Sequence, residues 1–380
     1  MVITKKLNEC AFINPKEIIP KGTLLKKVTM EKLQPFCRDI TEYERGEFRG
    51  GTKFRNDDTI MARITPCLEN GKTAKINFLD DGEIGFGSTE YIVFRAKKEI
   101  MDSDFLYYLI ISPLVRETAI KSMVGSSGRQ RVQTDVVANI EVKLPSLLKQ
   151  RNVANILKHI DDKIATNTAI NKNLESQAQA IFKSWFVDFE PFDGEMPRDW
   201  IISTLGSVSK MGAGGDKPKI VSNKKTSDCQ YPIYSNGLSE EGLYGYTNNY
   251  KIDKESVTVS ARGTIGFVCL RHIPYTPIVR LVVLEPNTDM VSAQYLYFWL
   301  KNINIAGTGT TQQQLTVPAF RKEEILLPNY DTMQSFTNVV SPLFNSIWHN
   351  QEENQILSQL RDTLLPRLMS GEIDVENVEV

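Results

Sequence analysis

Residues 144–189 read LPSLLKQRNVANILKHIDDKIATNTAINKNLESQAQAIFKSWFVDF, and this stretch decides the fold. Apolar residues recur along it at alternating steps of four and three, the 3.5-residue period of a helix in a left-handed coiled coil. The period predicts one helix over 146–188, roughly 65 Å long at 1.5 Å per residue. The stripe consists of Val153, Leu157, Ile160, Ile164, Asn167, Asn171, Leu174, Ala178, Ile181 and Trp185.

The same pattern returns 183 residues later without a gap, so that Leu144-Pro145 falls on Leu327-Pro328. We expect a second helix over 329–371, with Arg361 as its one poorly suited seam residue. Pro342 predicts that this helix kinks or begins near that residue. The second stripe consists of Phe336, Val340, Leu343, Ile347, Asn350, Asn354, Leu357, Arg361, Leu364 and Leu368.

Two asparagines lie near the middle of each predicted helix. In an antiparallel pair the midpoints meet, so Asn167 and Asn171 are expected to face Asn350 and Asn354 across a pseudo-twofold axis. A polar layer there would fix the register of the two helices, at some cost in stability. The alternative is that all four asparagines lie on solvated faces, and the seam period in both copies argues against it.

The rest of the chain repeats more loosely. Strand-like runs, a buried helix and a Gly/Ser/Thr loop follow one another in the same order before each Leu-Pro, while residues 16–55 and 210–251 share no similarity. The sequence therefore predicts an α+β fold, a pseudo-twofold tandem repeat of two similar globular α/β domains separated by two long antiparallel coiled-coil helices. The expected parts are a first domain (1–144), a central spacer helix (145–190), a second domain (191–327) and a distal spacer helix with an acidic tail (328–380).

Length and composition agree with this division. A chain of 380 residues with 41% hydrophobic and 24% charged residues is typical of two folded domains. No apolar run is long enough to cross a membrane and the N-terminus lacks a secretory signal, so we expect a cytoplasmic protein. Five widely spaced cysteines without a C-x-x-C predict neither a disulfide framework nor a zinc site.

Charge is distributed unevenly along the chain. The net charge is −1, but the segment after Leu327 holds 8 acidic and 2 basic residues, so the remainder is slightly basic. Both globular parts are therefore compatible with local phosphate-binding patches, although the charge does not by itself indicate them.

Catalytic motifs are missing. Gly71-Lys72-Thr73 resembles the end of a phosphate-binding loop, but Pro66 stands where that loop requires glycine. The three histidines are scattered, and no metalloprotease, nucleophile-elbow or amino-methyltransferase motif is present. We therefore expect a chain without catalytic residues, metal ions or cofactors.

The quoted motifs resemble those of the specificity subunit of type I restriction-modification systems over nearly the whole chain. The resemblance rests on Leu144-Pro145 followed by Gln150, on residues 174–189, and on LLPRLMSGEI at 364–373. Two departures are Gln334, one place later than the 183-residue offset from Gln150 predicts, and Pro342. The resemblance implies two target recognition domains, with spacer helices that dock two methyltransferase subunits. Adenine methylation and ATP-dependent DNA cleavage would lie in partner chains, and the presence of a restriction and translocation subunit is left open.

Two different target recognition domains imply an asymmetric, bipartite target in double-stranded DNA, and the two helices would set the distance between the half-sites. Phosphate contacts would position the domains and base-edge contacts would specify the sequence. Arg63 and Arg262 recur at matching places in the two domains. For every candidate the alternative is a simply solvated side chain. The candidate DNA-binding residues are Lys53, Arg55, Arg63, Lys72, Arg129, Arg131, Lys217, Lys219, Lys224, Arg262, Thr310, Gln312 and Gln313.

Two other functions remain open from the sequence. A structural coiled-coil adaptor would organise other subunits and show no sequence-dependent DNA binding. An enzyme with an unfamiliar site, such as a nucleotide methyltransferase, would bind a cofactor as an isolated chain, and the missing motifs argue against it.

Overall fold

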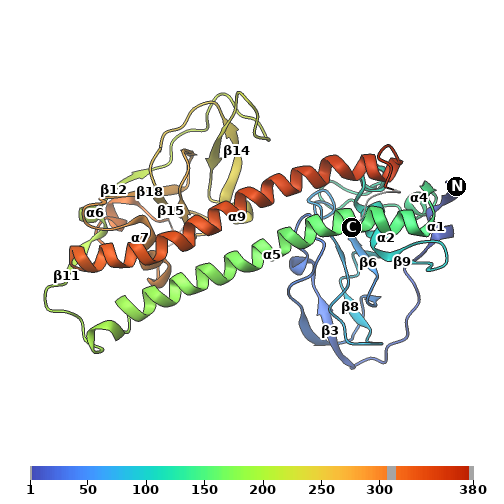
Figure 1. The fold of residues 1–380 in the computed structure, drawn as a ribbon, viewed down its shortest axis with the longest axis horizontal. Helices are drawn as coiled ribbons and strands as arrows, with labels where there is room; N and C mark the ends of the chain where they lie inside the picture. The colour runs from blue at the N-terminus through green and yellow to red at the C-terminus, as the bar shows by residue number, and fades with distance from the viewer. Residues whose placement is uncertain (1, 306–313, 376–380) are drawn as a thin grey trace. The chain divides into compact units, whose positions relative to one another are not determined.

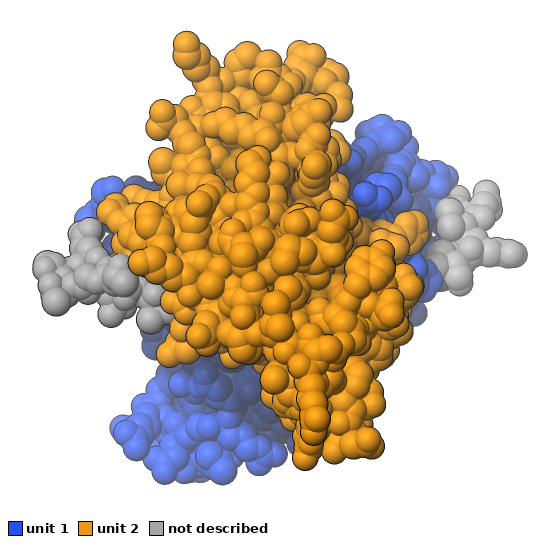
Figure 2. Space-filling view, turned by 90° about the vertical axis from the view of Figure 1, so that its left-hand side faces the viewer, with its two compact units in different colours: residues 1–169, 350–380 blue, residues 170–349 orange. Residues whose placement is uncertain are grey.

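The computed structural model describes residues 2–305 and 314–375, which divide into two compact units. Unit 1 comprises residues 1–169 and 350–380, and unit 2 comprises residues 170–349 (Figure 2). Each unit contains one α/β domain and about one half of each of two long helices, α5 (Leu147–Phe186) and α9 (Tyr330–Ser370). The expected domain limits follow the ends of these helices, whereas the compact units divide each helix near its middle.

Both long helices lie where the sequence predicted them, within two residues at each end (Figure 1). A start of the second helix near Pro342 is wrong, because α9 begins at Tyr330 and continues through the proline. Proline removes one helical hydrogen bond and costs about 3 kcal/mol in a helix interior. Burial of Phe336 and Val340 before it and of Phe344 after it offsets that cost by holding both sides of the helix against unit 2.

Unit 1 builds its α/β domain from two four-stranded sheets, ordered β2-β9-β6-β7 and β4-β3-β8-β5, and the short pair β1-β10. The central strand β9 is buried along nearly its whole length and is rich in aromatic and β-branched residues, which suit a strand covered on both faces. The elements are β1 (Ile3–Lys6), α1 (Leu7–Cys10), β2 (Ala11–Ile13), β3 (Leu24–Val28), η1 (Met30–Lys32), β4 (Glu44–Glu47), β5 (Thr52–Phe54), β6 (Thr59–Ala62), β7 (Thr73–Lys75), β8 (Gly85–Gly87), β9 (Tyr91–Ala96), α2 (Ser103–Ile111), α3 (Pro113–Lys121), α4 (Thr134–Ala138) and β10 (Glu141–Leu144).

Unit 2 repeats this topology. Its sheets are ordered β12-β18-β15-β16 and β14-β13-β17, with the pair β11-β19. The parallel pairing of β3 with β8 recurs as β13 with β17, although β3 and β13 lie in the segments, 16–55 and 210–251, that share no sequence similarity. The elements are η2 (Glu190–Phe192), β11 (Ile201–Thr204), α6 (Leu205–Val208), β12 (Ser209–Ala213), β13 (Tyr231–Tyr234), η3 (Ser239–Gly242), β14 (Leu243–Thr247), β15 (Ser256–Ser260), β16 (Val268–Arg271), β17 (Thr276–Pro277), β18 (Leu281–Pro286), α7 (Ala293–Asn302), α8 (Val317–Phe320) and β19 (Glu324–Leu327).

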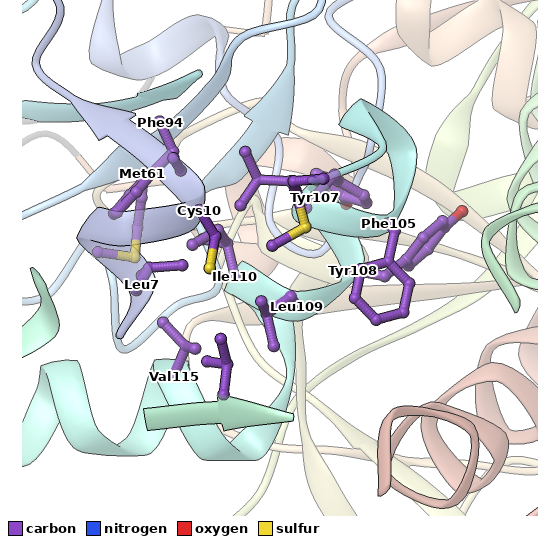
Figure 3. Packing of buried hydrophobic residues seen from close by; sticks show 14 of the residues in the cluster. Leu7, Cys10, Met61, Phe94, Phe105, Tyr107, Tyr108, Leu109, Ile110 and Val115 are labelled. Atoms are coloured by element: carbon purple, nitrogen blue, oxygen red, sulfur yellow. The ribbon is translucent and has the colours of Figure 1, made fainter. Parts of the chain in front are cut away.

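The core of unit 1 forms around α2. Asp102 caps this helix by accepting hydrogen bonds from the amides of Asp104 and Phe105, which satisfies two of its free N–H groups. Side chains of α2, including Phe105, Tyr107 and Leu109, then pack against β6, β9 and α1 (Figure 3). In unit 2 the corresponding helix α7 packs around Phe182 of α5.

Each long helix buries more than a coiled-coil seam. In unit 2, Phe182 and Phe186 of α5 lie outside the predicted stripe and are buried against α7 and α9. In unit 1 the contacts of α5 with α9 are antiparallel, since Asn167 bonds to Glu353 and Asp161 to Arg361. Arg361 is therefore not a poor seam residue, because a buried carboxylate compensates its charge.

Within 2–305 and 314–375, all five cysteines are free thiols and no cluster of side chains could hold a metal ion. No helix among these residues combines the length and the apolar character needed to span a bilayer.

Candidate nucleic-acid interface

Three of the four candidate arginines of unit 1 lie at the end of strand β6 or on the loop that returns to it. The backbone N–H of Arg63 bonds to the carbonyl of Glu90, and the Arg63 carbonyl accepts from Val132. The loop 124–131 returns to the same place, because Thr65 bonds to the carbonyl of Gln130. We call this group of residues, Arg63, Glu90, Arg129 and Arg131, the unit 1 corner.

Charges at the unit 1 corner are partly compensated. Arg131 donates to both carboxylate oxygens of Glu90, with its Nη2 at 2.6 Å from Oε1. This hydrogen bond from Arg131 holds the pKa of Glu90 below its ordinary value. Arg129 is exposed, and its side chain has no polar partner in the described part of the chain.

Arg63 has an unused donor. Its Nε is buried and finds no hydrogen-bond partner among residues 2–305 and 314–375. A buried donor without a partner costs roughly 1–3 kcal/mol, so such groups are uncommon in folded proteins. A ligand acceptor at this corner would satisfy it.

Unit 2 has a matching corner at the end of β15. The backbone N–H of Ala261 bonds to the carbonyl of Arg280, and Leu315 returns to the carbonyl of Ala261. Arg262 donates through Nε and Nη2 to Oε1 of Gln314, at 2.9 and 2.6 Å. We call Arg262, Arg280 and Gln314 the unit 2 corner.

The two corners share a frame but differ in chemistry. Glu90 and Arg280 each stand one residue before equivalent strands, β9 and β18, so an acid in unit 1 is replaced by a base in unit 2. Arg131 and Gln314 are separated by the same 183 residues that separate the long helices. Glu90, Arg280 and Gln314 were not among the residues expected from the sequence. Aligning the two strands β9 and β18 would have found the first two.

Lys53 and Arg55 belong to a different part of unit 1. Arg55 forms a two-pronged ion pair with Glu17, and the Lys53 ammonium bonds to the Glu17 carbonyl at 2.5 Å. The hydrogen bond from Arg55 keeps the pKa of Glu17 below its ordinary value, although burial opposes it. Arg95 joins Glu17 to the buried Asp58, so these cations have protein partners.

Lys72 lies beside the unit 1 corner, since its carbonyl accepts from Ala62 of β6. Its ammonium bonds to the Met30 carbonyl at 2.7 Å. In unit 2, Lys217 donates to the Tyr244 hydroxyl at 2.7 Å, and Lys217 and Lys219 line a shallow hollow of about 380 Å³.

Lys224 of unit 2 is exposed on the loop between β12 and β13. The remaining candidates, Thr310, Gln312 and Gln313, lie outside the described residues.

The helix asparagines make different contacts in the two units. In unit 1, Asn167 is fully buried and donates to Oδ1 of Asn354 at 2.9 Å and to Oε2 of Glu353 at 2.7 Å. In unit 2, Asn171 donates to the backbone carbonyl of Ile347 at 3.3 Å. That these asparagines fix the register, with Asn350 as the fourth member, stays a prediction.

The corners suit recognition of polar edges better than catalysis. An arginine fork can donate two parallel hydrogen bonds to a guanine edge, and a glutamine amide can both donate to and accept from an adenine edge. Strand ends and loops hold these groups on a packed scaffold, which is how binding sites are commonly built.

Comparison with known proteins agrees with this arrangement. A family model described as "Type I restriction modification DNA specificity domain" matches residues 6–176 and 197–359. The type I restriction enzyme MjaIX specificity subunit of Methanocaldococcus jannaschii is 27% identical, over 74% of this chain and 71% of that protein. The HindI specificity subunit of Haemophilus influenzae is 26% identical, over 84% of this chain and 87% of that protein.

Among solved structures, the S subunit of a type I restriction-modification system from M. genitalium has the same fold, with a TM-score of 0.58. The likeness covers 97% of this chain and 96% of that chain at 14% sequence identity. The family match extends over most of this sequence, in two segments that follow one another. The chain therefore belongs to the type I restriction-modification DNA specificity family, with its two α/β domains in tandem.

Proposed function

We propose that this chain is the DNA sequence-recognition subunit of a type I restriction-modification complex and reads an asymmetric, bipartite target. Residues 1–144 and 191–327 are the two readers, and 145–190 and 328–380 are the spacers. One observation carries the proposal: the ends of the equivalent strands β6 and β15 each carry an arginine, but Arg63 directly follows β6 whereas Arg262 stands one residue further along than its equivalent, and the neighbours of the two arginines differ. One scaffold with two sets of recognition groups suits two different half-sites.

Base reading is assigned to the two corners. Arg63 and Arg262 are the base-contacting candidates, because each lies within two residues of the end of its strand, β6 or β15, and has a planar guanidinium group that can donate two parallel hydrogen bonds. Arg129 and Arg131 belong to the loop that returns to the unit 1 corner. Thr310, Gln312 and Gln313, which lie outside the described residues, stay candidates from the sequence alone. Lys53, Arg55, Lys72, Lys217, Lys219 and Lys224 are assigned to phosphate contacts, which position a domain without reading sequence.

The chain acts with partners. Its net charge is −1, and phosphate contacts dominate the affinity of proteins for DNA, so tight binding requires a partner that supplies cationic surface. Two methyltransferase subunits docked on the spacers supply it and carry out adenine methylation in the cytoplasm. ATP-dependent cleavage belongs to a restriction subunit. The adaptor alternative is disfavoured, since the family description names DNA specificity.

Methylome sequencing of cells with and without the gene tests the function. A bipartite methylated motif should disappear when the gene is deleted, and exchange of residues 1–144 for another such domain should alter one half of that motif only. An unchanged methylome after deletion would refute the proposal.

Lysine replacements test the corners. Arg63→Lys and Arg262→Lys keep the charge but lose the fork, so each should weaken binding of the target by about 5- to 150-fold, the range for a lost base contact. Each should relax one half of the motif, and the half should differ between the two variants. Lys224→Ala should weaken binding to all sequences equally and reduce the salt slope by about one. Arginine variants that act like Lys224→Ala would reassign the corners to phosphate.

A further inference from the structure

Three polar side chains meet in the interior of unit 1. Arg361 of α9 donates through Nη1 to Oδ1 of Asp161 in α5, at 2.9 Å, and the hydroxyl of Tyr108 in α2 donates to Oδ2 of Asp161, at 2.7 Å. Asp161 and Arg361 are each 6% exposed and Tyr108 is fully buried (Figure 3 shows Tyr108 beside Phe105 on α2). Arg361 also donates to the carbonyl of Phe36 at 3.2 Å.

The equivalent place in unit 2 is apolar. The 183-residue offset between the helices carries Asp161 to Phe344 and Arg361 back to Ala178. The 190-residue offset between β9 and β18, applied to α2 and α7, carries Tyr108 to Phe298. All three equivalents are buried in one cluster, in which the rings of Phe298 and Phe344 lie 5.7 Å apart. The scaffold therefore accepts either an ion pair or an aromatic contact at this position.

We propose that the Asp161–Arg361 pair decides which helix end packs on unit 1: it admits the C-terminal half of α9 and excludes a second copy of α5. If two first halves of the chain paired with each other, Asp161 of each copy would face Ala178 of the other. If two second halves paired, Arg361 would face Phe344. The first wrong pairing buries the carboxylate of Asp161 without a cation. The second leaves Arg361 with only the neighbouring, exposed carboxylate of Asp362, 3.0 Å from its Nη2. Loss of the buried partner is strongly unfavourable in each case.

Stability alone does not require this cluster. Replacing a buried ion pair by well-packed apolar residues is often neutral or stabilising, and unit 2 contains that replacement. What an apolar arrangement in both units would lack is discrimination, because a phenylalanine that faces an alanine leaves no charge unpaired whichever halves of the chain pair. A protein with an internal repeat has two nearly equivalent helix–helix contacts. An unfavourable free energy for the wrong pairing of helices keeps the two contacts distinct.

The test uses the folded full-length chain with a protease site inserted between Gly194 and Glu195, in an exposed segment between the two repeats. Cleaved wild type is mixed in urea with the cleaved, isotope-labelled variant Asp161→Arg/Arg361→Asp, and the mixture is refolded and examined by native mass spectrometry. Wild-type fragments should pair with wild-type fragments and variant with variant. Cross-complexes should be depleted on the order of 100-fold, as expected when like charges meet in a buried site.

A surface pair provides the matched control. Lys149 and Asp374 lie 3.5 Å apart in the same unit, also on opposite sides of the cleavage site. Exposed ion pairs contribute little, so the variant Lys149→Asp/Asp374→Lys should form cross-complexes with wild type in statistical proportion. Statistical cross-complexes from the Asp161/Arg361 exchange would overturn the proposal.

A second variant covers the case in which the charge exchange prevents folding. Tyr108→Phe/Asp161→Phe/Arg361→Ala installs in unit 1 the residues that unit 2 already packs. After cleavage and refolding it should form homodimers of each fragment, which the cleaved wild type should not. Homodimers of wild-type fragments as abundant as those of this variant would also overturn the proposal.

Discussion

Replacement of Gln150 by alanine should lower the local stability of unit 1 by about 3 kcal/mol. The Gln150 side chain is 1% exposed and makes three hydrogen bonds. Its Oε1 accepts from the amide of Asp102 at 2.9 Å, and its Nε2 donates to the carbonyls of Ile100 at 2.9 Å and Pro145 at 3.0 Å. A hydrogen bond contributes about 1 kcal/mol net, and alanine leaves all three backbone partners unsatisfied. The loss would loosen the start of α5 from the cap of α2.

Gln334 offers a matched control, because it follows the second Leu-Pro as Gln150 follows the first. The structure places Met333, not Gln334, at the equivalent of Gln150, where the Met333 sulfur lies 3.9 Å from the hydroxyl of the cap residue Ser292. Gln334 is half-buried and its side chain has no hydrogen-bond partner in the described part of the chain. Gln334→Ala should therefore change stability by no more than about 0.5 kcal/mol.

Hydrogen exchange measured by mass spectrometry resolves the effect by segment. A loss of about 3 kcal/mol should speed exchange of peptides covering 100–111 and 145–153 by roughly 100-fold, since 1.4 kcal/mol is tenfold. Equal losses in the two glutamine variants, or a loss under about 0.5 kcal/mol for Gln150→Ala, would refute the assigned roles.

Two further predictions concern packing and pH. Phe182→Ala should destabilise unit 2 by about 3–5 kcal/mol, because Phe182 is fully buried among other rings, with Phe186 at 5.4 Å. Urea unfolding followed by tryptophan fluorescence reports this directly, since all four tryptophans lie in unit 2; Phe182→Leu should lose less, and an alanine loss below about 1 kcal/mol would contradict the packing. Glu17 has a folded pKa below its unfolded value, first because of the Arg55 hydrogen bond. The contribution of Glu17 to the free energy of unfolding is therefore complete above the pKa of the unfolded state, about 4.3, and is lost as the pH falls through the pKa of the folded state. Glu17→Gln should flatten the acid side of the stability curve measured by thermal melts from pH 7 to 3, and an unchanged acid slope would argue against the pair.

Family, tandem organisation and helix limits could be predicted because they depend on local pattern. The 3.5-residue period placed both long helices within two residues of their observed ends. The similarity of the segments around Arg63 and Arg262 pointed to equivalent strand ends, but the match of these two arginines was wrong by one residue, because the strand ladders place Ala261 at the equivalent of Arg63. A helix start near Pro342 was wrong, because packing against residues distant in sequence holds α9 on both sides of the proline.

Partners of individual side chains could not be predicted. From the sequence, Arg361 was expected to be poorly suited to the seam, because the aspartate that pairs with it, Asp161, lies 200 residues earlier in the chain. Glu90 and Arg131 are likewise far apart in the sequence, and they meet only because the loop 124–131 returns to β6. Spacing along the chain predicted that the middles of the two long helices meet, but it does not reveal which distant carboxylate the fold brings to a given arginine.

The sequence by itself determined the repeat, the two long helices and the family, because periodicity and motif order are properties of neighbouring residues. Only the tertiary structure decided which charges are compensated: Arg131 by Glu90, Arg55 by Glu17 and Arg361 by Asp161. The free-energy cost of a charged side chain depends on its burial, and a side chain is buried only after distant segments of the chain have packed around it. The same physical reason separates Arg63, whose buried Nε has no partner among residues 2–305 and 314–375, from the arginines whose guanidinium already has a carboxylate partner.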